Sequence, residues 1–212
     1  MRAVLHQRYG RPDVLELRDV QKPEIGDDQV LVRVHASSVN PVEWYGVSGP
    51  YFARVGNGMR RPKDQTVGAD LAGVVEAVGR DVTLFEPGDE VFGVSGGSWA
   101  EYTIAREDRL AKKPASLSFD EAAAVPVAAV TALQALRDKG DVQAGQKVLI
   151  NGASGGVGTF AVQLAKLLGA EVTAVCSTGN VEQARALGAD RVVDYTKEDF
   201  TKLGVQHDVV LD

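Results

Sequence analysis

Residues 148 to 158 join an apolar strand, a glycine-rich turn and the start of a helix, and this combination restricts the fold more than any other part of the chain. The run reads Val-Leu-Ile-Asn-Gly-Ala-Ser-Gly-Gly-Val-Gly, and an amphipathic stretch at residues 159 to 168 follows directly. The fingerprint of dinucleotide-binding turns has small residues at three positions, here Ala153, Gly155 and Gly158, with alanine in place of its first glycine.

Small residues are needed at these positions because the turn is tight, the backbone approaches a diphosphate closely, and the helix packs against the strand. The N–H groups and the positive dipole end of the helix then attract the phosphates. A glycine-rich turn can also be purely structural. The strand before this turn and the helix after it favour nucleotide binding.

The tip of the second strand indicates which nucleotide is bound. Sites that select NAD place an acid there, about 20 residues after the glycines, to hold the ribose 2′-OH. The expected second strand, Glu171–Cys176, has its acid at the wrong end, and residues 177 to 180 (Ser-Thr-Gly-Asn) contain none. Hydroxyl and amide donors suit a 2′-phosphate, although no arginine stands among them. We therefore expect NADP(H), with NAD(H) as the alternative.

Composition limits the class of protein. A chain of 212 residues with 44% hydrophobic residues can form one large or two small domains, and its net charge of −6 argues against nucleic acid as the main partner. Cys176 is the only cysteine, which excludes an intrachain disulfide and a Cys-rich zinc site. Residues 122 to 130 form the longest apolar stretch, too short to span a bilayer, and the N-terminus lacks a signal-peptide apolar core. We expect a cytoplasmic protein without a membrane partner.

The first half of the chain is predicted to be β-rich. Short apolar or alternating runs, separated by turn signals, lie at residues 3 to 6, 14 to 17, 30 to 36, 71 to 78, 90 to 94 and 100 to 105. In the third run Val30, Val32, Val34 and Ala36 share one face. This alternation is typical of a half-buried strand in an antiparallel barrel or sandwich.

The pattern changes near Ser118, where Ser-Phe-Asp-Glu fits a capping box at the start of a helix. Residues 128 to 137 are also expected to be helical, ended by Gly140. Strands follow at 147 to 151, 171 to 176, 191 to 194 and 208 to 211, with helices at 158 to 168 and 181 to 187 between them. Alternating strands and helices predict a doubly wound parallel sheet. The sequence thus predicts an α/β protein with two domains, residues 1 to 120 and 121 to 212.

The predicted sheet is incomplete. A full dinucleotide-binding sheet has six strands in the order 3-2-1-4-5-6, and this chain supplies four. The fourth would leave an apolar edge unpaired, which natural proteins avoid. We therefore expect the N-terminal portion of a longer protein, with a natural short form as the alternative. We also expect these 212 residues to have weak or no activity and to associate through the fourth strand.

Six ordered motifs resemble the medium-chain dehydrogenase/reductase superfamily, and within it the zinc-free quinone oxidoreductase (zeta-crystallin) branch. They lie at residues 38 to 43, 68 to 79, 87 to 93, 100 to 102, 131 to 136 and 152 to 158, so the resemblance covers essentially the whole chain. It implies a GroES-like barrel followed by a Rossmann domain, which is partial here. The family's C-terminal segment, which finishes the sheet and returns to the barrel domain, is absent from this sequence.

The resemblance also bears on metal binding. Zinc-dependent relatives carry a cysteine where Asn40 stands, a His-Glu pair where Ala69 and Asp70 stand, and a four-cysteine lobe. An amide and a carboxylate cannot replace a thiolate–imidazole set for zinc. The three histidines have no metal-ligand spacing. We therefore expect no metal.

Asn40, Tyr45 and Tyr51 match the polar and aromatic residues that surround the nicotinamide and the substrate in the family. Without a Lewis acid, reduction of an activated acceptor is easier than oxidation of a simple alcohol. A quinone or an α,β-unsaturated carbonyl takes a hydride at carbon, and a phenol can stabilise the charge that develops on oxygen. Asn40 could instead shape the turn before Pro41, and the tyrosines could be packing residues.

The resemblance implies a cofactor site that is spread over several segments. The residues expected to bind the cofactor are Ala153, Ser154, Gly155, Gly156, Val157 and Gly158 around the diphosphate, Ser177, Thr178 and Asn180 at the 2′-phosphate, Tyr195 beside the adenosine phosphate, and Thr131 facing the nicotinamide.

The sequence therefore predicts an NADPH-dependent oxidoreductase that transfers hydride to a quinone or activated enone without metal. The longer form is expected to be a homodimer. Two alternatives stay open: an NADPH-binding sensor or crystallin-like protein without catalysis, and an enoyl-reductase module of a biosynthetic assembly.

Overall fold

Two units with separate hydrophobic cores make up the protein in the computed structural model, which describes residues 1–202 and 204–212. The units are Met1–Val127 and Ala128–Asp212, so they divide at Val127, whereas the sequence places the domain boundary after residue 120. Each unit contains its own sheet.

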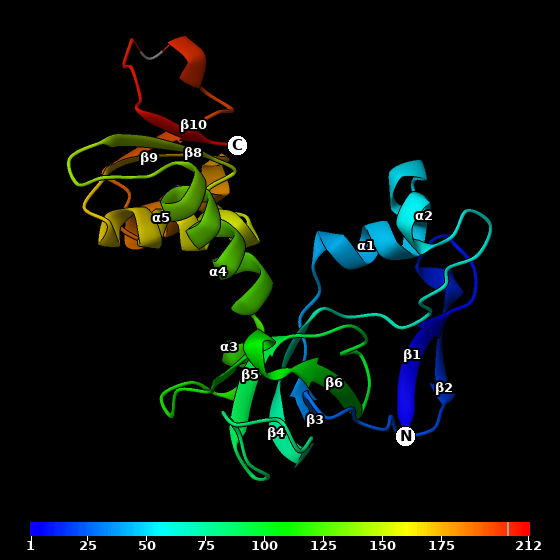
Figure 1. The fold of residues 1–212 in the computed structure, drawn as a ribbon. Helices are drawn as coiled ribbons and strands as arrows, with labels where there is room; N and C mark the ends of the chain where they lie inside the picture. Colours follow the sequence, from blue (N-terminus) through cyan, green and yellow to red (C-terminus); the bar gives the residue numbers. More distant parts are fainter. Residues whose placement is uncertain (203) are drawn as a thin grey trace. The chain divides into compact units, whose positions relative to one another are not determined.

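The first unit is built on antiparallel strands (Figure 1). β1 (Arg2–His6) and β2 (Leu15–Asp19) form a two-stranded sheet, and a second sheet has the order β6-β3-β4-β5-β7. The strands of this second sheet are β3 (Gln29–Ala36), β4 (Asp70–Val78), β5 (Glu90–Val94), β6 (Tyr102–Arg106) and β7 (Leu110–Lys112). The predicted antiparallel first half is therefore confirmed, with β2 shifted toward the C-terminus because the 3₁₀ turn η1 (Pro12–Val14) precedes it.

The core of the five-stranded sheet follows from the alternation in β3. Val30 and Val32 are buried among Leu71, Val75 and Val91, while Arg33 on the same strand is exposed. Leu31 is buried as well, which simple alternation does not predict. The register between β3 and β4 shifts between Leu31 and Val32, and such a bulge changes the face to which a side chain points.

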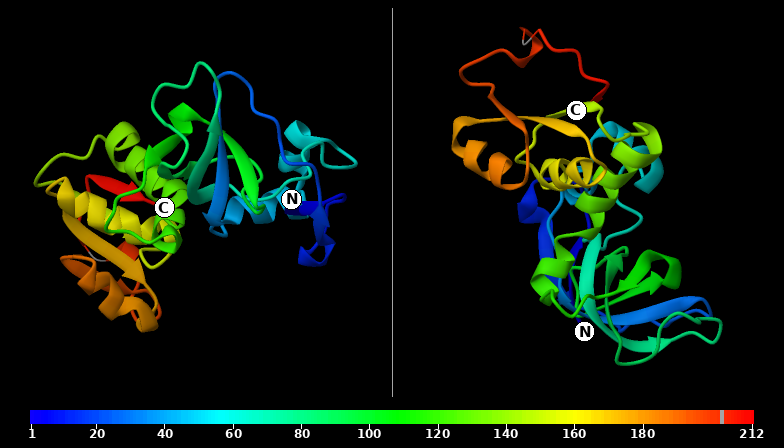
Figure 2. Two further views of the ribbon diagram at one scale, coloured as in Figure 1. Left: turned by 90° about the horizontal axis from the view of Figure 1, so that it is seen from below. Right: turned by 90° about the vertical axis from the view of Figure 1, so that its left-hand side faces the viewer.

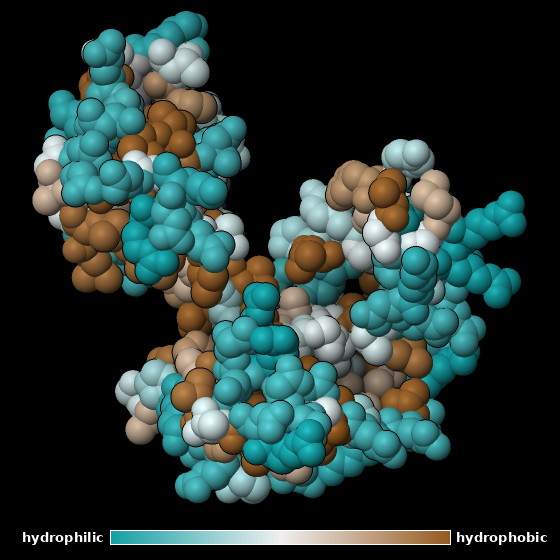
Figure 3. Space-filling view, in the orientation of Figure 1, coloured by the Kyte–Doolittle hydropathy of each residue, from teal (hydrophilic) through white to brown (hydrophobic). Residues whose placement is uncertain are grey.

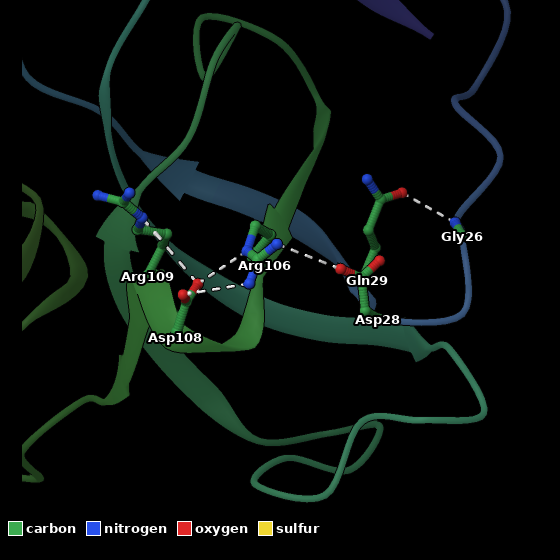
Figure 4. Close-up of polar contacts among 6 residues, drawn as sticks. All are labelled: Gly26, Asp28, Gln29, Arg106, Asp108 and Arg109. Atoms are coloured by element: carbon green, nitrogen blue, oxygen red, sulfur yellow. Dashed lines mark hydrogen bonds and ion pairs between the residues drawn. The ribbon is translucent and has the colours of Figure 1, made fainter.

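Ion pairs between exposed side chains link the start of β3 to the end of β6. Arg106 pairs with Asp108, and a guanidinium nitrogen lies 3.5 Å from Asp28 Oδ2 (Figure 4). The same figure shows Gln29 Oε1 accepting a hydrogen bond from the backbone N–H of Gly26. The Arg106 guanidinium lowers the pKa of the Asp108 carboxyl. Such exposed pairs each contribute little to stability.

Two helices of the first unit were not predicted. α1 (Pro41–Ser48) and α2 (Tyr51–Asn57) follow β3, with Asn40 as N-cap and Pro41 at the first helical position of α1. Both helices are short and carry aromatic and β-branched residues, so their sequence lacks a helical apolar period. Exposed large apolar side chains gather on them, including Trp44, Phe52 and Val55. Figure 3 shows tan and brown side chains over this part of the chain.

The helix at the end of the first unit has the predicted start. α3 (Phe119–Ala123) begins after Ser118, whose Oγ accepts from the N–H of Glu121, and Glu121 Oε2 accepts from the N–H of Ser118. This is the capping box that the sequence indicates.

The second unit contains a parallel four-stranded sheet in the order β10-β9-β8-β11, which in chain order is 3-2-1-4 as predicted. Its strands are β8 (Lys147–Asn151), β9 (Glu171–Cys176), β10 (Arg191–Asp194) and β11 (Val209–Leu211). The helices are α4 (Pro126–Leu133), which starts before the division, α5 (Gly156–Leu167) and α6 (Val181–Ala186). The remaining short helical segments of the protein are η2 (Glu107–Arg109), the π-helical η3 (Gln134–Lys139), η4 (Thr178–Asn180) and η5 (Phe200–Lys202).

The faces of this sheet are covered differently (Figures 1 and 2). Helices α5 and α6 pack on one face, where Ala161, Val162 and Ala184 join Ile150 and Val172 in the larger core. On the other face Phe200 packs against a smaller cluster of Leu149, Val175 and Val193. Strands of this sheet are apolar on both faces because both faces are covered.

Small differences from the predicted boundaries have local causes. The single helix expected at residues 128 to 137 is α4 followed by η3, and the N–H of Gly140 donates to the carbonyl of Ala135, five residues back. α5 begins two residues before the predicted start, at Gly156. β11 lies at the edge of the sheet with Val210 exposed. Among the described residues, no helix is both long and apolar enough to cross a membrane.

Candidate functional site

The fingerprint residues of the second unit form the predicted strand–turn–helix. Gly152 has a positive φ of 68°, and the N–H of Gly155 donates to the Gly152 carbonyl at 2.9 Å, which closes the turn. Ala153 is fully buried, and its N–H donates to Val175 on β9. The turn is therefore anchored to the neighbouring strand.

The start of α5 leaves backbone donors facing outward from the helix end. Gly155 is the N-cap and has no side chain that could accept from them, and the N–H of Thr159 is the first to bond back, to the Gly155 carbonyl. The N–H groups of Gly156, Val157 and Gly158 thus precede the first helical hydrogen bond. Together with the positive end of the helix dipole they make a site suited to an anion.

The glycines of the turn differ in whether the surrounding protein leaves room for a side chain. A Cβ added at Gly158 would overlap the Gly152 carbonyl and come within 2.8 Å of Ala153 Cα, so this glycine is needed for packing. A Cβ at Gly155 would meet only the Gly152 carbonyl, at 3.3 Å, and one at Gly156 would meet only Ala128 Cβ, at 4.0 Å. Neither residue has a positive φ. A side chain at 155 would thus press on a backbone oxygen, whereas packing and φ do not require glycine at 156, so the room at Gly156 is available to a ligand.

α4 lies beside this turn, because Ala128 is the neighbour nearest to Gly156. Thr131 follows Ala128 by three residues, which places it on the same side of the helix, and it is exposed. The predicted nicotinamide residue is therefore on a helix that adjoins the fingerprint turn.

The tip of β9 presents the expected polar residues. Asn180 Nδ2 donates to Ser177 Oγ at 3.0 Å, so the Ser177 hydroxyl keeps its hydrogen for another acceptor. Thr178 Oγ1 donates to Asp194 Oδ2 at 2.6 Å. The structure brings these residues together at one edge of the sheet.

Asp194 adds an acid that the sequence does not place at this tip. No acid follows β9, as expected, but Asp194 ends β10, which pairs with β9 in parallel, so its carboxylate lies beside the tip of β9. Parallel neighbours bring their carboxyl ends to one edge, so this acid could have been found from the strand order. Its side chain is bonded to Thr178 and Thr196, and these hydrogen bonds hold the pKa of the carboxyl well below its usual value. Tyr195, the next residue, is exposed.

In the first unit, Asn40 belongs to a closed group of hydrogen bonds with Ser38 and Asp70. Asn40 Nδ2 donates to Ser38 Oγ and to Asp70 Oδ2, both at 2.9 Å, and Ser38 Oγ donates to Asp70. Both amide hydrogens of Asn40 are used here, so its Oδ1 is the atom left for a ligand. Asn40 also begins α1, so the interpretation as a turn residue and the interpretation as a site residue are compatible.

The two tyrosines are placed differently. Tyr45 on α1 is 47% exposed and makes an edge-on ring contact with Phe52, whereas Tyr51 at the start of α2 is 74% exposed. Neither is a buried packing residue within its unit. Each phenol is accessible as a hydrogen-bond donor.

Glu43 was missed by the sequence analysis. Its carboxylate accepts from the N–H of Asn40 at 2.6 Å and from the N–H of Ala69 at 2.9 Å, and it is buried. It ties the start of α1 to the segment before β4. The sequence signal for this role is the acid three residues after Asn40, which is the spacing of a capping box at the start of a helix.

Across residues 1–202 and 204–212, no group of three or more His, Cys, Asp or Glu side chains is arranged to hold a metal ion. Asn40 and Asp70 are hydrogen-bonded to each other.

Two family models match the chain. Residues 26–115 match the alcohol dehydrogenase GroES-like domain, and residues 156–212 match the zinc-binding dehydrogenase model. The first match agrees with the expected GroES-like first unit, and the second lies in the parallel sheet and its helices.

Several curated proteins are similar to this chain. A 2-methylene-furan-3-one reductase of Solanum lycopersicum is 42% identical over the whole chain and 56% of its own length. An NADPH-dependent alkenal/one oxidoreductase of Arabidopsis thaliana is 40% identical, over the whole chain and 57% of its length, and a Homo sapiens quinone oxidoreductase is 43% identical over 84% of this chain and 53% of its own. The chain spans about half the length of the curated relatives it matches.

Solved structures agree. The quinone oxidoreductase of Coxiella burnetii matches with a TM-score of 0.90 and 37% identity, over the whole chain and 68% of that protein. The Escherichia coli quinone oxidoreductase in complex with NADPH matches with a TM-score of 0.82 and 27% identity, over 94% of this chain and 60% of its own. The predicted architecture, a GroES-like domain followed by a partial Rossmann sheet, is confirmed.

Proposed function

The chain belongs to the medium-chain dehydrogenase/reductase superfamily, in its quinone oxidoreductase and alkenal reductase branch, and we propose that it is an NADPH-dependent oxidoreductase that reduces a quinone or an activated enone. Relatives named for these activities support the substrate class, and two matching structures contain NADPH.

The room at Gly156 carries this proposal. Neither its φ nor its neighbours require glycine at this position, and it lies where the first N–H groups of α5 are free of helical partners. A side chain at this position would lie beside those donors. This fits a diphosphate held by backbone N–H groups, as in other dinucleotide sites.

When bound, NADPH supplies a hydride to an electrophilic carbon of the acceptor. The residues of this chain then have three tasks. The backbone at Gly156, Val157 and Gly158 binds the diphosphate, and Ser177 and Tyr195 bind the adenosine end. A phenol, from Tyr45 or Tyr51, donates a hydrogen bond to the acceptor oxygen, where negative charge develops. Asn40 accepts a hydrogen bond from the bound ligand through Oδ1, because its two amide hydrogens are donated to Ser38 and Asp70.

The proposal is tested by two measurements on a protein that includes the remaining length found in its relatives, because these 212 residues alone are expected to have weak or no activity. NADPH binding is followed by fluorescence titration, and NADPH oxidation is followed with a panel of benzoquinones, phenanthrenequinone and short-chain enones. Binding together with reduction of at least one acceptor class supports the proposal. Binding without reduction of any acceptor favours a sensor, and failure to bind NADPH or NADH overturns the assignment of the site.

A further inference from the structure

Two segments of the second unit have nearly the same sequence and the same local structure. They are Asp194-Tyr195-Thr196-Lys197 and Asp199-Phe200-Thr201-Lys202. In each, Oδ1 of the aspartate accepts from the threonine N–H at 3.0 Å and from the threonine hydroxyl at 2.6 Å. In each, the lysine three residues on pairs with Oδ2, at 3.2 Å for Lys197 and 3.0 Å for Lys202.

The first segment differs from the second in its position. Asp194 ends β10 beside the tip of β9 and is 8% exposed, and its Oδ2 also accepts from Thr178. Lys197 and Thr178 therefore meet at one carboxylate oxygen. The ammonium of Lys197 is thereby held at the tip of β9, where the 2′-phosphate of NADPH is expected.

The hydrogens at this carboxylate can be counted. A threonine hydroxyl has one hydrogen, and Thr178 uses it on Asp194, so Thr178 has no hydrogen to donate to a phosphate. Each oxygen of Asp194 already accepts from two groups, so the carboxylate is not available to a ribose hydroxyl in the manner of an NAD-selective acid. An acid at this position thus does not by itself favour NAD.

Lys197 retains donors. An ammonium has three N–H groups, one of which points to Asp194, and the side chain is 68% exposed. The charge of Asp194 is matched by that of Lys197, and the remaining N–H groups can approach a phosphate from the solvent side. Residues 177 to 180 lack an arginine for this task.

We propose that Lys197 selects NADPH over NADH by pairing its ammonium with the 2′-phosphate, held in place through the oxygen of Asp194 that it shares with Thr178. The inference rests on the proposed function, because it assumes that the nucleotide lies at the start of α5 and extends toward the tip of β9. In this arrangement Thr178 holds the Asp194 carboxylate, and Ser177 is the residue whose hydroxyl can donate to the 2′-phosphate.

The test uses Lys197→Met, with Lys202→Met as matched control, since Lys202 has the same partner geometry in the second segment. The affinities for NADPH and NADH are measured by fluorescence titration at low and at moderate salt. Loss of one charge-assisted contact is expected to weaken NADPH binding by about tenfold. NADH binding is expected to change less than about twofold, as are both affinities in Lys202→Met. Lys197→Arg is expected to restore most of the preference.

Two results would overturn the inference. They are an unchanged ratio of NADPH to NADH affinity in Lys197→Met, whether or not both affinities fall, and an equal loss of NADPH binding in the Lys202→Met control. The inference about Lys197 and the proposed oxidoreductase activity can be tested separately. A protein that prefers NADPH through Lys197 but reduces no acceptor would support the inference and overturn the oxidoreductase proposal, whereas a protein that binds neither nucleotide would overturn both.

Discussion

Asn40 Nδ2 lies 2.9 Å from Oδ2 of the fully buried Asp70, and this hydrogen bond fixes the start of α1 against the first residue of β4. The other oxygen of Asp70 accepts from the N–H of Val127 at 2.8 Å, and Ser38 donates to Oδ2 as well. Two segments that are distant in sequence from β4 thus converge on this carboxylate.

Asp70→Ala is expected to destabilise the protein by about 1 to 3 kcal/mol, because it removes the carboxylate that accepts from Ser38, Asn40 and the N–H of Val127. Asp70→Asn, which retains one acceptor oxygen, is expected to cost less. The free energy of unfolding from urea titrations checks both values. Equal stability of Asp70→Ala and the unsubstituted protein would show that water or other groups satisfy these donors.

Gly156→Ala is expected to separate binding from folding. The added methyl group meets nothing closer than Ala128 Cβ at 4.0 Å, and alanine favours a helix by up to about 1 kcal/mol over glycine. The protein should therefore unfold at the same or a slightly higher temperature. NADPH binding should fall by at least about tenfold, because the methyl group stands in front of the helix N-terminus.

Gly158→Ala is the matched control for this experiment and should behave in the opposite way. Its Cβ would overlap backbone atoms of Gly152 and Ala153, which are not free to move. We expect a loss of stability of about 1 to 3 kcal/mol from this overpacking, seen as a lower melting temperature without any ligand. If Gly156→Ala bound NADPH normally, the space at Gly156 would not be the diphosphate site.

The second unit was largely predictable because its elements repeat one simple pattern. Apolar strands are followed by amphipathic helices that end at glycines, and β9 and β10 have the expected bounds. The strand order also follows from the rule for doubly wound sheets. Asp194 is less evident in the sequence, because only the strand order places it beside Thr178, 16 residues earlier in the chain.

The first unit was less predictable for a physical reason. α1 and α2 are held by contacts with distant residues, such as those of Glu43 with Ala69 and of Arg54 with Tyr9, rather than by their own helical propensity. Tertiary contacts of this kind override local preference. The three-residue β7 forms only because it pairs with β5.

Tyr45→Phe and Tyr51→Phe distinguish a donor to the substrate from a surface residue. Both rings are substantially exposed, so removing a hydroxyl should change the free energy of unfolding by less than about 0.5 kcal/mol. The variant that lacks the donor should lose about tenfold to a hundredfold in kcat with an active quinone or enone, while NADPH affinity is unchanged. Full activity of both single variants and of the double variant would exclude a phenol as donor.

Asp194 gives the protein a pH dependence with a defined sign. Hydrogen bonds from Thr178 and Thr196 lower the pKa of its carboxyl from the ordinary value of 3.8. The ionised group therefore stabilises the fold at any pH above about 4, and this contribution is lost progressively as the pH falls from there toward the lower pKa of the folded state. In Asp194→Asn the group does not titrate. The variant should be less stable than the unsubstituted protein near neutral pH, and the difference should shrink in urea titrations at about pH 3 and below. An undiminished difference at that pH would mean that the side chain acts through its shape rather than through its charge.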